Sequence, residues 1–459
     1  MNTRILVHSI LLAACMSGAT ATAADLDAVY RRALTNDPLI READANRLAA
    51  RESKPQALAA LLPQLNGNGR YDDSNTDNTS TEIDPPDPPS EFVRNSDGTQ
   101  TIWQVELRQS VFSWENWAAL RRASSEVAQA EADYLAAQQD LILRTSEAYF
   151  NVLAARDTLE AAVAAHDAIG RQLEQSEKRF EVGLIAVTDV QEAKAAFDSA
   201  TATLIQAKRA LATTGERLRE LTGDTFDELS KPGPTMPLAG PNPANPDDWV
   251  ALAMKQNARL TSSQLGADIA RENISVARGG HFPSLDFVVN RSSFDSDEDI
   301  TGSITGQADG ESDDTTYSLQ VTVPIFSSGA TSSRVRQAQY RNTAARERHE
   351  RTARETERET RDAYLGVNSE VARVQSLRQA VESAQTALQA TEAGYEVGTR
   401  TSVDVLEARR RLFESQTNYA RSRYDYLLNV LRLQLAAGTL DAKGLADINA
   451  HLTESVSVR

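Results

Sequence analysis

Two carboxylates spaced for ion selection, Asp404 and Glu407, lie in the second copy of a repeated motif. Residues 180–194 read FEVGLIAVTDVQEAK and residues 395–409 read YEVGTRTSVDVLEAR, so the two copies align without a gap. Because Asp404 and Glu407 are three residues apart, both can point the same way from a helix. Several copies of the chain around an axis would place these carboxylates in rings. Such rings select cations, and a bound cation could block the passage. The alternative is that Asp404 is a first-turn carboxylate favoured by the helix dipole.

Nothing in the sequence supports catalysis. The histidines are not at metal-ligand spacing, and no nucleophile elbow or phosphate loop occurs. Most of the net charge of −17 comes from two acidic stretches, residues 72–97 and 295–314, which gives no sign of nucleic-acid binding. We therefore expect neither an enzyme, a cofactor, a metal centre nor a nucleic-acid partner.

Long helix-forming segments flank both copies of the motif. We predict helices at about 114–182, 188–221, 330–397 and 402–436, too long to fold into a globule and therefore packed against other long helices. Each motif is then the turn of a helical hairpin, at residues 183–188 and 398–402. Within the first turn, Thr188 could simply cap its helix, since Thr188 and Gln191 fit a capping box.

Four segments alternate between apolar and polar residues, with the period of a strand. They span about 64–72, 101–112, 284–292 and 315–325, and the acidic stretches between the members of each pair are expected to be loops. With preceding helices at 25–62 and 248–278, the chain divides into two structural repeats, residues 24–222 and 248–438. We interpret residues 223–247 as a proline-rich linker and residues 439–459 as a loose tail.

The first 23 residues have the pattern of a secretory signal peptide, with a cleavage site at Ala21-Thr22-Ala23. A competing lipidation site exists at Cys15, the only cysteine. No apolar run is long enough for a transmembrane helix, so entry into a membrane would require a closed barrel. Four strands cannot close one. Two copies would give eight strands with an interior filled by side chains, whereas three give twelve and leave a lumen, which the polar inward faces favour. The alternatives are a two-layer α+β protein and a periplasmic coiled-coil structural or adaptor protein without a barrel.

The chain contains ALLPQL at 60–65, VPIFSSG at 323–329, GYEVGTRTSVDVLEAR at 394–409 and RYDYLLN at 423–429. Through these segments it resembles the TolC family of outer-membrane efflux proteins over nearly its whole length. It implies a mixed α/β membrane protein: a homotrimer whose twelve-stranded barrel, four strands per chain, spans the outer-membrane lipid of a Gram-negative bacterium. The barrel would continue as a long α-helical barrel in the periplasm. A periplasmic adaptor and an inner-membrane RND or ABC transporter would dock there to export drugs or polypeptides.

The resemblance also implies roles for the tip residues. Asp404 and Glu407 would form the constricting ring, although Glu407 stands where the family pattern has Asp. Thr188 and Asp189 would accept hydrogen bonds from the other hairpin, from Arg400 and Tyr395, with a further link through Arg423. This latch would hold the entrance shut. From the residues themselves, Gly183 and Gly398 are predicted to be turn glycines with positive φ. These glycines and their neighbours would contact the adaptor, namely Val182, Gly183, Leu184, Val397, Gly398 and Thr399.

Overall fold

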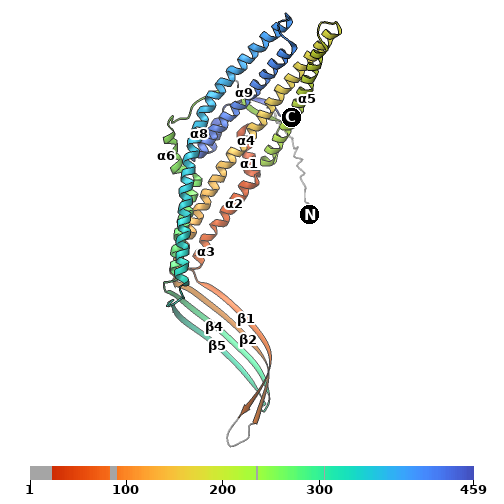
Figure 1. The fold of residues 1–459 in the computed structure, drawn as a ribbon. Helices are drawn as coiled ribbons and strands as arrows, with labels where there is room; N and C mark the ends of the chain where they lie inside the picture. The colour runs from red at the N-terminus through yellow and green to blue at the C-terminus, as the bar shows by residue number, and fades with distance from the viewer. Residues whose placement is uncertain (1–22, 83–89, 234–235, 304, 459) are drawn as a thin grey trace, which may run out of the picture. The chain divides into compact units, whose positions relative to one another are not determined.

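The computed structural model describes residues 23–82, 90–233, 236–303 and 305–458 (Figure 1). The predicted signal peptide, Cys15 included, lies outside the described residues except for Ala23. The chain forms two compact units. Unit 1 contains Met1–Arg41, Gln138–Val250 and Glu359–Arg459, and unit 2 contains Glu42–Ala137 and Ala251–Arg358. Within the described ranges, no helix has a stretch both long and apolar enough to cross a bilayer.

The two halves of the chain follow a similar order of shorter helices, two strands and two long helices, with three helices before the strands in the first half and two in the second. The first half comprises α1 (Leu26–Asn36), α2 (Pro38–Arg51), α3 (Ser53–Ala59), β1 (Gln64–Glu82), β2 (Ser90–Phe112), α4 (Trp114–Glu181) and α5 (Val187–Thr222). After β3 (Glu228–Pro232), the second half comprises α6 (Pro246–Gln256), α7 (Ala258–Gly279), β4 (Ser284–Gly302), β5 (Gly306–Thr322), α8 (Ala330–Glu396) and α9 (Ser402–Ala437). The chain ends with α10 (Ala442–Asn449) and β6 (Leu452–Ser457).

The helices that precede each strand pair are interrupted, where the sequence predicted continuous ones. Asp37, before Pro38, has an extended backbone (φ −62°, ψ 122°), because the proline ring disfavours the helical conformation in the preceding residue. Asn257 is extended at the equivalent place, and its side chain accepts a hydrogen bond from the Leu260 amide at 3.0 Å. The prediction missed both breaks because apolar periodicity continues across them.

Unit 2 contains a four-stranded antiparallel sheet in the order β1-β2-β4-β5. All four predicted strands are present, but they are 17 to 23 residues long, and most of each acidic stretch is strand rather than loop. Even like charges face one another, as in the Asp97–Asp299 pair. The backbone ladder needs no apolar alternation once a hairpin has set its register, so strands continue where alternation ends.

One row of apolar residues crosses the whole sheet. Leu65 is paired with Leu107, Leu107 with Val289, and Val289 with Tyr317. Directly paired residues share a face, so these four side chains lie on one side of the sheet. Leu65 and Tyr317, on the edge strands, are 69% and 72% exposed. The sheet therefore presents apolar side chains that the protomer does not cover.

Unit 1 has a buried core where residues far apart in sequence meet. Tyr149 is fully buried, and its hydroxyl donates a hydrogen bond to the Ser230 carbonyl at 2.6 Å. β3 pairs with β6, so the predicted linker and the predicted loose tail form a two-stranded sheet together. Residues 439–459 are therefore not a loose tail over their described part. Pairing between segments so far apart in the chain leaves no periodic signal in either of them.

Candidate functional site

Both hairpin turns have the same backbone design. The amide of Leu184 donates to the Arg179 carbonyl at 2.9 Å, and the amide of Thr399 donates to the Gly394 carbonyl at 2.8 Å. These bonds close α4 and α8 as Schellman motifs, which require a left-handed residue. Gly183 and Gly398 supply it with φ of 74° and 80°, as predicted from the sequence.

The turns expose apolar side chains. Val182, Leu184 and Val397 are 69%, 72% and 74% exposed. Val187 and Val403, at the starts of α5 and α9, are also exposed. Exposed apolar residues gathered at one place are typical of surfaces that bind another protein.

Asp404 belongs to a capping box at the start of α9. Its Oδ2 accepts hydrogen bonds from the Thr401 amide at 2.9 Å and from the Thr401 hydroxyl at 3.0 Å. In return, the Asp404 amide donates to the Thr401 hydroxyl at 3.3 Å. The two bonds from Thr401 lower the pKa of Asp404, and Arg400 adds to the effect. Asp404 therefore stabilises the start of α9, together with the N-cap Thr401, and stays charged at neutral pH.

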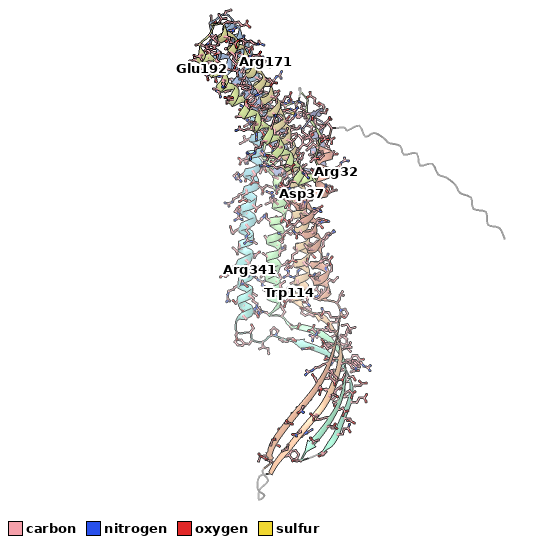
Figure 2. The ribbon with its side chains drawn as sticks, turned by 90° about the vertical axis from the view of Figure 1, so that its right-hand side faces the viewer. Arg32, Asp37, Trp114, Arg171, Glu192 and Arg341 are labelled. Atoms are coloured by element: carbon pink, nitrogen blue, oxygen red, sulfur yellow. The ribbon has the colours of Figure 1, made fainter. Side chains whose placement is uncertain are left out.

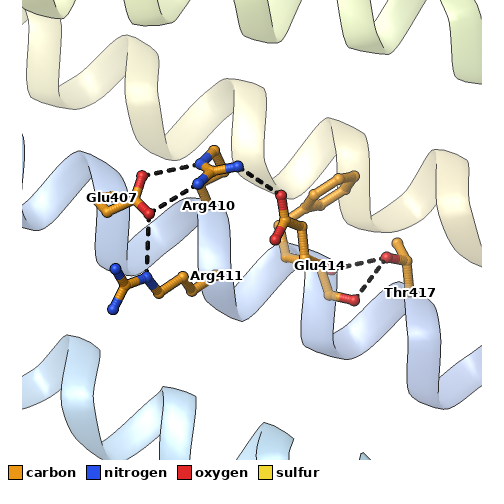
Figure 3. A network of polar contacts seen from close by, with 6 residues as sticks. Glu407, Arg410, Arg411, Glu414 and Thr417 are labelled. Carbon is orange, nitrogen blue, oxygen red and sulfur yellow. Dashed lines mark hydrogen bonds and ion pairs between the residues drawn. The ribbon is translucent and has the colours of Figure 1, made fainter.

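Glu407 is paired with two arginines of its own helix (Figure 3). Arg410 donates to both carboxylate oxygens, at 2.9 and 2.8 Å, and Arg411 donates to one at 3.1 Å. Hydrogen bonds from Arg410 lower the pKa of Glu407 to about 2, and Arg411 adds to the effect. Arg410 also donates to Glu414 at 2.8 Å. The arginines were visible in the sequence at helical pairing distance, but the sequence-based prediction did not use them.

A groove of about 540 Å³ lies beside this network. Ala195 and Ala196 of α5 line one wall, and Leu406 and Phe413 of α9 line another. Glu407, Arg410 and Glu414 line the same groove. Arg171 of α4 and Glu192 of α5 lie near the turn end of the first hairpin (Figure 2). The charged pair of Glu407 and Arg410 is thus directed toward the first hairpin.

The structure places the acceptors of the predicted latch differently from the expectation. α5 begins at Val187 with Ala186 as its N-cap, so Thr188 is inside the helix and is not the cap. The Asp189 carboxylate accepts from the Ala186 amide at 3.3 Å. Asp189, rather than Thr188, thus supplies the side-chain oxygen that accepts a backbone hydrogen bond at the start of α5, because an alanine N-cap has no side-chain oxygen.

Tyr395 does contact the first hairpin, but through its ring. The Arg179 guanidinium of α4 lies over this ring, 4.8 Å from its centroid. The Tyr395 hydroxyl is buried and has no hydrogen-bond partner among the described residues. Sequence reasoning had no signal for Arg179, because the contact joins two hairpins that lie far apart in the chain.

Arg400 and Arg423, two of the predicted latch donors, make other contacts within the protomer. The stem of Arg400 folds back over Gly394, where its Cγ lies 2.8 Å from the position of an added Cβ. Arg423 donates to the Pro232 carbonyl at 3.0 Å and to the Gly233 carbonyl. It lies far beyond Ser402, about 30 Å along α9, and so cannot reach the turn of its own protomer. In the part of the chain that the structure describes, no hydrogen bond joins Thr188 or Asp189 to Tyr395, Arg400 or Arg423.

Metal ligands are not gathered at the tips or elsewhere in the described part of the chain. No three His, Cys, Asp or Glu side chains there are placed to hold a metal ion. The chemistry available at the tips is that of charged, polar and apolar side chains around two rigid turns.

Comparisons with known proteins agree with this architecture. The chain is 36% identical to the outer membrane protein TolC of Vibrio cholerae, with 94% of each chain covered. It is 27% identical to the alkaline protease secretion protein AprF of Pseudomonas aeruginosa, covering 92% of this chain and 86% of that protein. The solved structure of the outer membrane protein VceC of Vibrio cholerae has the same fold, with a TM-score of 0.71, 22% identity and 90% and 96% coverage. The family model described as "Outer membrane efflux protein" matches residues 29–224 and 249–439, so the chain belongs to the outer membrane efflux protein family.

Proposed function

We propose that three copies of this outer-membrane protein form one exit duct for drug efflux, type I protein secretion, or both. Each copy would contribute four strands to a twelve-stranded barrel and two hairpins to a helical barrel in the periplasm. The outer-membrane location and the role in efflux follow from the family. The trimer, the closed barrel and the partners are the proposal.

The observation that carries the proposal is the open, partly apolar sheet. Its edge strands, β1 and β5, are 19 and 17 residues long, and within the described chain neither has a second neighbour in the sheet. Unpaired edges inside a bilayer would leave backbone groups without hydrogen bonds, which costs several kcal/mol per group. Joining β5 of one copy to β1 of the next removes all edges. The apolar row from Leu65 to Tyr317 would then face lipid.

The repeated element order supports a tube made from duplicated halves. In both halves, a strand hairpin leads within a short connection into a very long helix, α4 of 68 residues or α8 of 67 residues. The two stretches matched by the family model, residues 29–224 and 249–439, cover one half each. A trimer would contain six helical hairpins, whose six turns would lie together.

The turns are the proposed gate and docking surface. Their exposed valines and leucine would bind a periplasmic adaptor, and the adaptor would recruit an inner-membrane RND or ABC transporter. Within one protomer, the Arg179 guanidinium lies over the Tyr395 ring and so joins the two hairpins close to their turns. Arg400 could meet Thr188 and Asp189 only between protomers, and that pairing stays a prediction. The carboxylate of Asp404 would face the constriction.

Barrel closure is tested by joining the two edges. A cysteine replacing Gly67 in β1 is combined in turn with cysteines at positions 311–319 of β5, and outer membranes are oxidised. The proposal predicts covalent trimers at the matching register and no larger species. The matched control places the second cysteine in β4, which lies inside the sheet, and should give no intermolecular product. A monomer in detergent, or open-ended ladders beyond the trimer, would refute the proposal.

A further inference from the structure

We infer that Arg411, with Arg410, sets the ion selectivity of the tip, and that Asp404 alone supplies its cation preference. This inference rests on the proposed trimeric duct. It departs from the simplest expectation, in which Asp404 and Glu407 form two equivalent carboxylate rings.

The first step concerns Glu407. Arg410 binds both of its oxygens and Arg411 binds one, all within 3.1 Å. The charge of Glu407 is therefore compensated within its own helix. Glu407 and Arg410 also line the groove toward α5. A carboxylate held in this way contributes little to the field at a constriction.

The second step concerns the face of α9 that carries Asp404. At 100° per residue, Arg411 lies almost directly in line with Asp404, two turns or about 10 Å further along the helix. Its side chain is 71% exposed. In three copies, a ring of arginines would follow the ring of aspartates along the same face.

The third step is the net charge. The charges of Asp404, Glu407, Arg410, Arg411 and Glu414 sum to −1 per protomer, whereas Asp404 and Glu407 alone would give −2. The tip should therefore prefer cations only weakly and admit anionic solutes. Positively charged rings are what anion-conducting pores use for selection.

The test is the reversal potential of the full-length protein reconstituted in planar bilayers under a KCl gradient. Arg411→Gln should raise the permeability ratio of potassium to chloride at least about threefold, because three positive charges leave the tip. Asp404→Asn should bring the ratio to one or below. Glu407→Gln should change it less than Asp404→Asn does, because Glu407 lines the groove toward α5, whereas Asp404 does not.

Two matched variants separate charge from structure. Arg411→Lys keeps the charge and should keep the wild-type ratio. Arg378→Gln removes an exposed arginine of α8 that pairs with Glu382 at 3.7 Å, several turns before that helix ends at Glu396, and should leave the ratio unchanged. The inference, but not the proposed function, would be overturned by either of two results. One is an Arg411→Gln channel with the wild-type permeability ratio, and the other is an equal effect of Glu407→Gln and Asp404→Asn on that ratio. Absence of channels from the wild-type protein would overturn the proposed function, and the inference with it.

Discussion

Replacing Tyr395 with leucine should open the tip, whereas replacing it with phenylalanine should not. Close to the turns, the hairpins are in contact through the Arg179 guanidinium, which lies over the Tyr395 ring at 4.8 Å, and the Tyr395 hydroxyl has no partner in the described part of the chain. Phenylalanine keeps the ring face that attracts the cation, and leucine removes it.

The expected size follows from the contact and the symmetry. A cation–π contact at a partly exposed site contributes about 0.5–1 kcal/mol. Three copies that open together would lose about 1.5–3 kcal/mol, which raises the ratio of open to closed channels roughly 10-fold to 150-fold. Arg179→Gln should have a similar effect. The double variant Arg179→Gln/Tyr395→Leu should add little to either single change, because both remove the same contact.

The assay is the open fraction of single channels in planar bilayers. Arg171→Gln is the matched control, since Arg171 lies on the same helix two turns before Arg179 and should not affect gating. If Tyr395→Phe opens the channel as much as Tyr395→Leu, a hydrogen bond from the hydroxyl holds the tip, and the argument from the ring is refuted.

Three further predictions concern stability and pH. Tyr149→Phe should destabilise the protein by about 1–2 kcal/mol, because the buried hydroxyl no longer binds the Ser230 carbonyl; an unchanged urea midpoint would contradict this. Tyr424→Phe should lower the free energy of unfolding by about 1–3 kcal/mol, because the Asp157 carboxylate loses the donor that binds it at 2.6 Å. Burial raises the pKa of Asp157, so this carboxylate depends on its hydrogen bond. A milder effect of Asp157→Ala would argue against this prediction. Glu407, with a pKa lowered from 4.5 to about 2, contributes stability that is complete above pH 4.5 and is lost as the pH falls toward 2. The stability lost in Glu407→Gln should therefore be equal at pH 7.5 and pH 5, and a change between these two pH values would count against the pairing.

Much of the fold could be predicted because its signals are local. The long helices follow from uninterrupted helix-forming residues, and Gly183 and Gly398 mark turns that need positive φ. The family resemblance predicted from the tip and barrel motifs is confirmed by the family match. The strands were found by alternation, but their ends were not. Alternation reports an apolar face and stops where that face ends, whereas backbone pairing continues through the acidic residues beyond it.

The sequence alone determined the long hairpins, the strand pairs, the two glycine turns and the carboxylates at the second turn, because each depends on neighbours within a few residues. Only the tertiary structure decided which distant groups meet. It paired β3 with β6, placed Arg179 over Tyr395, and put Arg423 on the carbonyls of residues 232–233. It also assigned Glu407 its charge partners, since the choice among several possible pairings depends on side-chain packing. Contacts between distant parts of the chain have no periodicity, so they become visible only when the chain is folded.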